Sequence, residues 1–290
     1  MKKMFFILVA VCCIQCESTQ KPNSKFGGVQ IGTITYSYRS MPDQTLKAIL
    51  NYTVQSGINS VELLGGTMEQ YAGIPQDRDD FRQWRTTVSM DKFEEIKKMF
   101  DQEGVKINMV NFGYSRSLSD EEIDYQFKVC KTLGAKGIVA EISEEAAQRL
   151  APFADKHNLY VIMHNHEQPG NPDFSFDKIL SYGTRLMLNF DVGHYYRATG
   201  QNPCDLIKRL NKRIVSLHLK DRTGPQNLSE VSNLPFGEGE TPIVEILQLI
   251  QKEKWPIVCD IEQEYNIPQG SDAVKEVIKC VEYCRKALVK

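Results

Sequence analysis

The chain has 290 residues, 41% of them hydrophobic and 25% charged, and its formal net charge is −2 at pH 7. This length and apolar content suffice for one large core, and α/β barrels commonly occupy about 250 residues as a single domain. The near-neutral charge, without a basic stripe or an RNA-binding motif, excludes nucleic acid as an expected partner.

The N-terminal segment differs from the rest of the chain. Lys2 and Lys3 precede the apolar run 4–14, and polar residues follow it. A basic start, a short apolar stretch and a polar end are typical of a secretory signal, and this stretch is too short to span a bilayer as a stable helix. We therefore assign 1–25 to a signal and tether and 26–290 to the folded domain, and we expect a periplasmic or envelope protein of a bacterium.

Three cysteines close the apolar run, an arrangement that resembles a bacterial lipoprotein signal, in which the mature chain begins at a lipidated cysteine. Cys16 is the expected site because a polar tether follows it. Gln15 stands where a small residue is usual, so plain secretion is the alternative. The other five cysteines show no disulfide or zinc spacing, and we expect buried thiols at Cys130, Cys204, Cys259, Cys280 and Cys284.

From about residue 28 onward, strand-like runs alternate with helical runs in eight pairs. The predicted strands are 29–36, 60–64, 106–112, 137–142, 159–164, 185–191, 213–218 and 256–262. The predicted helices are 43–56, 90–103, 119–133, 144–157, 174–182, 203–210, 241–253 and 271–288. Eight βα units predict a (β/α)8 TIM barrel, whose active site lies at the C-terminal ends of the strands.

Local signals support these helices. N-cap residues are expected at Asp43, Ser119 and Ser271, and C-cap glycines follow three helices, at Gly57, Gly104 and Gly134. Two connections, 65–89 with Trp84 and 222–240 with the string PFGEGE, are longer than a barrel needs. Both leave C-terminal strand ends, so we expect them to wall or cover a substrate site.

Polar side chains stand near the ends of four consecutive predicted strands. The runs are YVIMHNHE, LMLNFDVGH, IVSLHLKD and PIVCDIEQE. Asp191 follows His164 by 27 residues, and His218 follows Asp191 by 27, about one strand plus one helix each. The strand ends should therefore lie side by side, and a ring of imidazoles and carboxylates there predicts a metal site or an acid/base site.

Alternation along a strand points His164 and His166 to the same side, and it does the same for Asp260, Glu262 and Glu264. Parity alone does not choose within either set. For His164, metal or substrate contact competes with a hydrogen-bonded histidine in the barrel mouth. His166 belongs to the second shell or faces the substrate.

Other candidates carry alternatives of their own. Asp191 ends a buried strand and must be paired or metal-bound. His194, in the turn that follows, binds substrate or metal, or caps the next helix. Lys220 forms a local ion pair with Asp221 or steadies an oxyanion. Glu141, at the end of the fourth strand, is a catalytic carboxylate or a solvated loop residue. Tyr36 is expected to wall the pocket, and Trp84 to anchor its loop.

The strings HNHE, DVGH, LHLKD and GEG, in this order, resemble the xylose-isomerase-like barrels. That superfamily includes sugar isomerases, ketose 3-epimerases, inosose dehydratases and endonuclease-IV-type repair enzymes. The resemblance covers essentially the whole chain after residue 26. It implies one divalent metal ion held from strands five to eight, with Asp191, His218 and Glu262 matching the ligands of the last three.

The chain departs from the epimerases on strand five, where they have a glutamate that binds metal and moves a proton. His164 occupies that place, and Glu141 is the expected replacement as a base. The expected metal ligands are His164, Asp191, His218 and Glu262, and the expected catalytic residues are Glu141, Glu262, His166, His194 and Lys220. Histidines with carboxylates suit Mn, Zn, Co or Fe better than Mg.

These inferences predict a metal-dependent sugar isomerase or epimerase that acts through an enediolate on a small carbohydrate. Two alternatives stay open, namely a lyase on a keto-sugar or keto-cyclitol, which the missing glutamate favours, and a metal-free carbohydrate-binding barrel. A repair enzyme is not expected, because that group binds three metals and the chain has too few ligands. A membrane is an expected partner only through the lipid anchor.

Overall fold

The computed structural model describes residues 21–227 and 233–289. The predicted export signal and Cys16 lie outside these residues. Among the helices that are described, none has both the length and the apolar character needed to cross a membrane.

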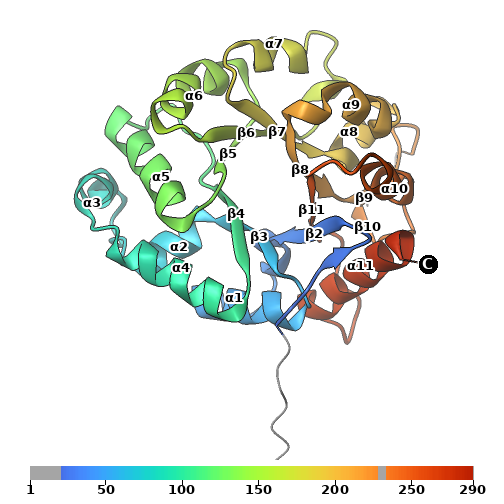
Figure 1. Ribbon diagram of the computed structural model, residues 1–290, viewed down its shortest axis with the longest axis horizontal. Helices are drawn as coiled ribbons and strands as arrows, with labels where there is room; N and C mark the ends of the chain where they lie inside the picture. Colours follow the sequence, from blue (N-terminus) through green and yellow to red (C-terminus); the bar gives the residue numbers. More distant parts are fainter. Residues whose placement is uncertain (1–20, 228–232, 290) are drawn as a thin grey trace, which may run out of the picture.

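Eight parallel strands form a closed barrel, with β2 paired to both β3 and β11. They are β2 (Val29–Ile34), β3 (Ser60–Leu64), β4 (Lys106–Asn111), β5 (Gly137–Glu141), β6 (Tyr160–His164), β7 (Leu186–Asp191), β8 (Ile214–Leu219) and β11 (Val258–Ile261). The strands follow one another around the barrel in chain order, and helices surround them (Figure 1). The predicted (β/α)8 barrel is confirmed.

The outer layer consists of eleven helices in the described part of the chain. They are α1 (Leu46–Gln55), α2 (Gly65–Ala72), α3 (Phe81–Thr87), α4 (Asp91–Glu103), α5 (Asp120–Leu133), α6 (Glu144–His157), α7 (Phe176–Ser181), α8 (Val192–Thr199), α9 (Pro203–Leu210), α10 (Ile243–Glu253) and α11 (Ala273–Leu288). Helix α10 shows why the helices pack on the barrel. Its buried residues recur at the spacing of one helix face, so this face is apolar; they are Ile243, Ile246, Leu247 and Ile250.

Helix N-termini follow the sequence signals in part. Ser119 caps α5 in a full capping box with Glu122, as expected. Helix α1 is capped by Thr45, because Asp43 instead accepts a hydrogen bond from the Thr45 backbone at 2.8 Å and turns the chain ahead of the helix. The predicted cap at Ser271 is also wrong.

Asp272 caps α11 in its place and accepts a hydrogen bond from the backbone N–H of Lys275. The Ser271 hydroxyl is used elsewhere, since it donates to Glu276. At the C-terminal ends, Gly104 and Gly134 are left-handed caps of α4 and α5, as predicted. Gly57 has a positive φ of 73° and follows the cap of α1, Ser56.

The two long connections hold more structure than predicted. Residues 65–89 form α2, a short 3₁₀ turn and α3, and Trp84 packs edge-on against Tyr125 of α5, with ring centroids 6.0 Å apart. Trp84 therefore anchors its segment, as expected. The second connection begins with a small hairpin, in which β9 (Asp221–Arg222) pairs with β10 (Asn233–Leu234). Helix α8, which follows β7 without a loop, was not predicted.

The chain joins the barrel before the first parallel strand. Strand β1 (Lys25–Phe26) pairs antiparallel with β2. Ser24 is fully buried, and its hydroxyl donates to the Ile31 carbonyl at 2.6 Å. The last residues of the predicted tether thus pack on the barrel.

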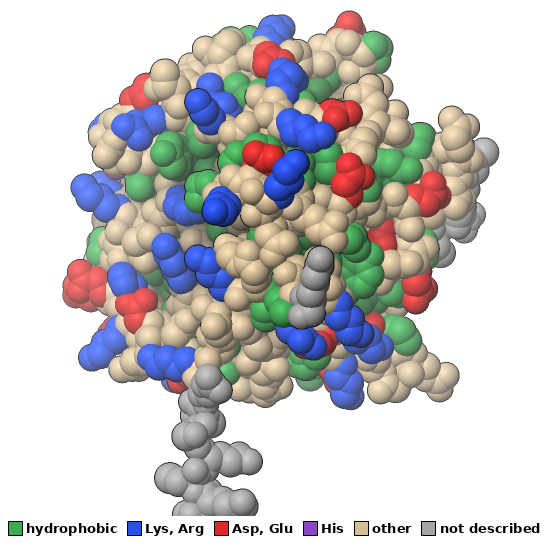
Figure 2. Space-filling model, turned by 45° about the vertical axis from the view of Figure 1, so that its right-hand side comes forward, with side chains coloured by type: hydrophobic (Ala, Val, Ile, Leu, Met, Phe, Trp, Pro, Cys, Tyr) green, Lys and Arg blue, Asp and Glu red, His purple; other side chains and the backbone are tan. Residues whose placement is uncertain are grey.

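The core lies mostly between the strands and the helices, and it includes all five described cysteines as free, buried thiols, as predicted. In Figure 2, charged side chains of both signs are scattered over the face in view, and no histidine is visible on it. The barrel interior combines apolar residues such as Met109 and Ile162 with buried polar ones such as Asn189 and Ser216. The polar side chains at the C-terminal end of the barrel form the site.

Candidate metal centre

The strand register brings the four predicted ligands together at the C-terminal end of the barrel. His164 ends β6, Asp191 ends β7 and lies opposite His218 of β8, and Glu262 directly follows β11. One ligand atom from each residue lies within 4.8 Å of the other three, and all four residues are buried. The cluster that the sequence predicted therefore exists in the fold.

Each of the four residues has one buried atom that makes no hydrogen bond. These atoms are His164 Nδ1, Asp191 Oδ2, His218 Nδ1 and Glu262 Oε2. Lys220 forms ion pairs with Asp191 Oδ2 and Glu262 Oε2, but none of the four atoms has a hydrogen bond of normal geometry, and a buried polar atom without one costs about 1–3 kcal/mol. A divalent cation would satisfy all four at once, and two imidazoles with two carboxylates form a donor set that transition metals accept.

The spacing of the cluster requires only small movements for an ion. Two ligands bonded at about 2.0–2.2 Å lie at most about 4.4 Å apart. The largest separation of 4.8 Å must therefore shrink slightly, while His218 Nδ1 and Glu262 Oε2, now 2.7 Å apart, must open. The imidazoles of His164 and His218 face each other with their ring centroids 4.6 Å apart.

Three of the four ligands have the protonation state that metal binding requires. Burial and the neighbouring His218 lower the pKa of His164 to about 4, so this ring is neutral at pH 7. Burial alone would raise the pKa of Asp191 and of Glu262, but the Lys220 ammonium and the neighbouring histidines together outweigh burial and hold both pKa values below their usual range. For His218, burial lowers the pKa, yet two flanking glutamates raise it well above its ordinary value.

Lys220 is a buried cation beside the cluster. Its ammonium lies 3.3 Å from Asp191 Oδ2, 3.2 Å from Glu262 Oε2 and 2.6 Å from Glu264. The expected ion pair with Asp221 is wrong, because neighbouring residues of a strand point to opposite sides. Asp221 instead accepts backbone hydrogen bonds from Gly237, Gly239 and Thr241 and so folds the GEGE loop.

His194 lies in the first turn of α8, rather than in a loop. The helix starts at the Asp191 carboxylate, whose Oδ1 accepts from the His194 backbone N–H at 2.7 Å, so Asp191 caps a helix as well as joining the cluster. The His194 ring lies between Lys220, at 3.1 Å, and Arg222, at 2.5 Å. Burial lowers its pKa to about 3, which keeps the ring neutral.

Gly193, the glycine of the string DVGH, allows α8 to pack closely against the end of β8. A Cβ at Gly193 would lie 2.4 Å from the Lys220 carbonyl oxygen, so only glycine lets α8 approach the end of β8 this closely.

Glu141 and His166 form an acid–imidazole pair above the cluster. Glu141 Oε1 lies 2.9 Å from His166 Nδ1 and accepts a second hydrogen bond from Gln168 at 2.9 Å. The two side chains are about half exposed, with 56% of Glu141 and 46% of His166 accessible. His166 also lies edge-on to His164, with 4.8 Å between the ring centroids.

A cavity of about 300 Å³ opens over the cluster and is lined from several strands. Tyr36 is one of its walls, as predicted, and the predicted catalytic side chains Glu141, His166 and Glu262 all face it. Its lining residues are Ile34, Tyr36, Leu64, Asn111, Gly113, Val139, Glu141, His164, His166, His218, Glu262 and Glu264.

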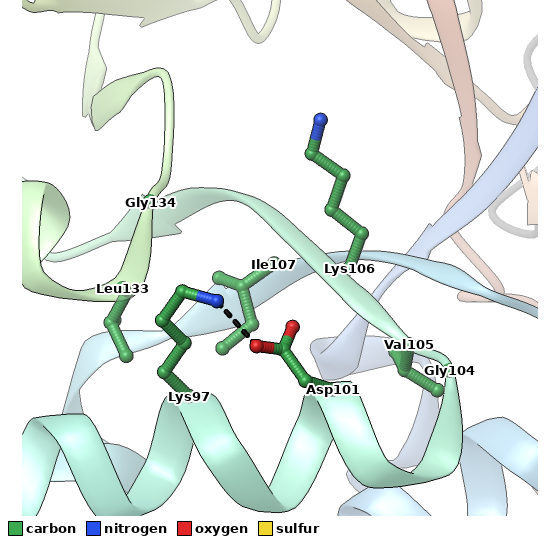
Figure 3. A pocket seen from close by; sticks show the side chains of 8 residues that line it. All are labelled: Lys97, Asp101, Gly104, Val105, Lys106, Ile107, Leu133 and Gly134. Atoms are coloured by element: carbon green, nitrogen blue, oxygen red, sulfur yellow. Dashed lines mark hydrogen bonds and ion pairs between the residues drawn. The ribbon is translucent and has the colours of Figure 1, made fainter.

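Other cavities lie at the opposite end of the barrel. One of about 350 Å³ lies between the start of β4 and the ends of α4 and α5. In Figure 3, Lys97 and Asp101 pair with each other there, and Lys106 extends away from them. Another of about 590 Å³ is lined by Trp255 and other mainly apolar residues. Neither gathers titratable groups around one point, so the cavity over the four ligands is the candidate site.

Among the buried polar residues of the site, Glu62 was not predicted, and Asp260 was named only as one of three candidates on its strand. Glu62 of β3 contacts His218 and two asparagines, Asn111 and Asn189. Asp260 lies in the barrel interior with both carboxylate oxygens free of hydrogen bonds, and burial, with the nearby Glu62 charge, raises its pKa to about 7. A carboxylate inside an otherwise apolar strand, SVELL, is the sequence signal that could have identified Glu62.

The fold resembles solved structures closely at low sequence identity. A sugar phosphate isomerase/epimerase from Parabacteroides distasonis is 19% identical, with a TM-score of 0.63 over 91% of this chain and 96% of that chain. The probable 3-DHS dehydratase AsbF from Bacillus anthracis is 16% identical, with a TM-score of 0.64 over 88% and 98%. The IolI protein, whose structure contains a zinc atom, is 15% identical, with a TM-score of 0.65 over 90% and 98%. Identities this low show the fold alone.

Sequence comparison identifies the family directly. No curated protein matches the chain. A family model described as xylose isomerase-like TIM barrel matches residues 50–284, which is most of the chain and contains all four residues of the cluster. The protein therefore belongs to the xylose isomerase-like TIM barrel family.

Proposed function

We propose that this protein is a divalent-metal-dependent isomerase or epimerase of a small sugar. The observation that carries the proposal is the set of four buried ligand atoms without hydrogen bonds, at the base of a cavity lined by further acid/base groups. The volume, about 300 Å³, lies at the small end of ligand sites and suits a monosaccharide-sized molecule.

The mixed nitrogen and oxygen donors favour Mn, Zn, Co or Fe over Mg, which prefers oxygen ligands and retains water. A divalent ion held by His164, Asp191, His218 and Glu262 would supply a Lewis acid that polarises a sugar carbonyl and acidifies the neighbouring C–H.

Two groups from different strands are placed to move the proton. Glu262 reaches the cavity from the end of β11, and the Glu141–His166 pair reaches it from β5 and the turn after β6. Either can accept a proton from a carbon beside a carbonyl and return it. Return to the same carbon from the other side gives epimerisation, and return to the neighbouring carbon gives isomerisation.

The remaining polar groups hold this arrangement. Lys220 keeps Asp191 and Glu262 ionised and positions Glu264 at the cavity wall. Neutral His194 lies between Lys220 and Arg222, and the Arg222 guanidinium also contacts Glu167 at 3.0 Å. We assign Lys220 and His194 to orientation of the cluster and of substrate oxygens.

A lyase on a keto-sugar or keto-cyclitol is the second candidate, and one feature favours it. His164 stands where the epimerases that this chain resembles have a proton-transferring carboxylate, so one of their two carboxylate bases is missing. Elimination of a β-hydroxyl needs one base and one acid, which Glu262 and the His166–Glu141 pair would supply. The resemblance to the AsbF fold is compatible with this reaction class.

Two measurements separate the possibilities. Elemental analysis of the purified protein after metal loading should find one divalent ion per chain, whereas a metal-free carbohydrate-binding barrel would retain none. A panel of aldoses, ketoses and keto-cyclitols, followed by NMR, should then show conversion without loss of mass for an isomerase or epimerase. A lyase would give products lighter by one water.

We propose further that the protein is exported and attached to the cell envelope of a bacterium through lipidated Cys16. The support is the basic start, the apolar run and the cysteine that follows it. Cys16→Ser should release the protein from the membrane fraction without changing its fold. Unchanged membrane attachment would contradict lipidation at Cys16.

A further inference from the structure

Glu62 is a fully buried carboxylate beneath the four-residue cluster. It lies in the middle of β3, between the apolar residues Val61 and Leu63, and does not line the cavity. Its Oε2 lies 2.8 Å from His218 Nε2 and accepts from the Asn189 side-chain amide at 2.8 Å. Its Oε1 accepts from the Asn111 side-chain amide, also at 2.8 Å.

These contacts determine which nitrogen of His218 carries the proton. An ionised carboxylate can only accept hydrogen bonds, so His218 Nε2 must donate to Glu62. A histidine that binds a metal ion keeps a single N–H, so in the metal-bound state the lone pair lies on Nδ1. That nitrogen faces the cluster, 2.7 Å from Glu262 Oε2, and makes no hydrogen bond of its own.

Glu62 is itself held in place from a third strand. Asn189 of β7 donates to Glu62 through its amide nitrogen, while its Oδ1 accepts from the Ser216 hydroxyl at 2.8 Å. The carboxylate, which can only accept, therefore fixes the amide nitrogen towards Glu62, and the hydroxyl donates to the amide oxygen that remains. Asn111 of β4 fixes the second carboxylate oxygen. Strands β3, β4, β7 and β8 thus hold one carboxylate at one orientation against one imidazole.

Two simpler roles do not fit these contacts. Glu62 cannot be a base for the substrate, because it is fully buried and does not reach the cavity. It is also not one of the four residues whose ligand atoms converge. Burial of a carboxylate in an apolar strand is costly, and the hydrogen bonds from His218, Asn189 and Asn111 offset that cost.

We propose that Glu62 is a positioning residue of the metal centre, which orients the His218 ring and leaves its Nδ1 lone pair directed at the ion. The inference rests on the proposed metal-dependent function. A carboxylate behind a metal-bound histidine increases the basicity of the ligand nitrogen, and removal of such a group typically weakens metal binding by about 10–100-fold.

The test is a titration of metal-free protein with Zn²⁺ against a chromophoric chelator. Glu62→Gln keeps the size of the side chain but accepts through only one oxygen, and it should weaken Zn²⁺ binding by about 10–100-fold. Glu69→Gln is the matched control, since Glu69 is also a buried glutamate but pairs with Arg85 far from the cluster. It should leave the Zn²⁺ affinity unchanged even if it lowers the melting temperature.

The outcomes are distinguishable. Wild-type protein that binds no Zn²⁺ would overturn the proposed function together with this inference. Wild-type binding with an unchanged affinity in Glu62→Gln would overturn the inference alone. A measurement on wild-type protein keeps the test open if the variant does not fold: ¹⁵N NMR of the zinc-loaded protein should show His218 protonated at Nε2 and bonded to zinc through Nδ1. The opposite assignment would contradict the role of Glu62.

Discussion

His218 Nδ1 lies 2.7 Å from Glu262 Oε2, and neither atom makes a hydrogen bond of normal geometry. The two residues come from consecutive parallel strands of the barrel: His218 lies in β8, and Glu262 directly follows β11, which pairs with β8. A close pair of this kind, with His164 and Asp191 beside it, is an arrangement that a shared cation would complete.

Asp191→Asn should remove the ion without removing the helix that starts there. The asparagine keeps an oxygen that can accept from the His194 backbone N–H, so α8 stays capped, but the ligand loses its charge. We expect metal affinity to fall by more than about 100-fold, beyond the effect of changes outside the ligand shell, and activity to fall with it. Metal analysis and circular dichroism on the same sample test this, and full metal content would remove Asp191 from the ligand set.

Glu141→Gln should separate proton transfer from metal binding. The substitution keeps the contact with His166 but removes the basicity of the carboxylate. Turnover should fall by about 10²–10⁴, the usual contribution of a general base, while metal content stays at the wild-type value because the four ligands are intact. Full activity on a confirmed substrate would make Glu141 a bystander and leave the proton chemistry to Glu262.

Gly193→Ala should destabilise the junction of α8 and β8. The added methyl group would lie 2.4 Å from the Lys220 carbonyl oxygen, so the backbone must shift, at a cost of about 1–3 kcal/mol. Gly66→Ala is the control, because no atom lies within 4 Å of a Cβ there and the residue is helical. Chemical denaturation should show no loss for the control, and equal stability of both variants would refute the packing argument.

Glu276→Gln should lower stability in a pH-dependent way. Glu276 is 1% exposed; burial would raise its pKa, but hydrogen bonds from Lys279, Ser271 and Tyr265 outweigh burial and lower it. Because the folded-state pKa lies below the unfolded value, the carboxylate stabilises the fold above about pH 4.3 and loses this effect as pH falls through the folded pKa.

The variant should therefore be less stable by about 1–3 kcal/mol at pH 7, and the difference should shrink towards zero in acid. Denaturation at pH 7, 5 and 3.5 measures this. Glu282→Gln, on the exposed face of the same helix, is the control and should change little at any of these values. A difference that is constant with pH would show that the charge of Glu276 is not responsible.

The barrel and its four ligands could be predicted from the sequence because both depend on repeated local patterns. Each ligand stands where an apolar strand gives way to polar residues, and parallel strands place these points at one rim. The helix α8 was missed because it begins directly at Asp191, without an intervening turn, just as α2 begins directly after β3. Its start depends on the same carboxylate that the sequence assigned only to the metal.

Glu62 and the contacts of Lys220 could not be predicted, because they depend on contacts between strands: across the barrel for Glu62 and between adjacent strands for Lys220. Glu62 is separated from His218 by most of the chain, and nothing local marks it apart from a single acid in an apolar run. Lys220 was paired with its sequence neighbour Asp221, whereas its three carboxylate partners come from β7 and from the segment after β11. Closure of the barrel brings Glu62 to His218, whereas the register of β7, β8 and β11 brings the carboxylates to Lys220.

The most direct test of the account follows deuterium from solvent into sugar. Protein loaded with Mn²⁺ or Zn²⁺ is incubated in deuterium oxide with a panel of ketoses and aldoses, and ¹H NMR records exchange at the carbon beside the carbonyl. The account predicts deuterium in substrate and product with the metal-loaded protein, and its loss after treatment with a chelator or in Asp191→Asn. Exchange that persists undiminished without metal, or its absence from every sugar with a fully loaded protein, would contradict a metal-dependent isomerase or epimerase.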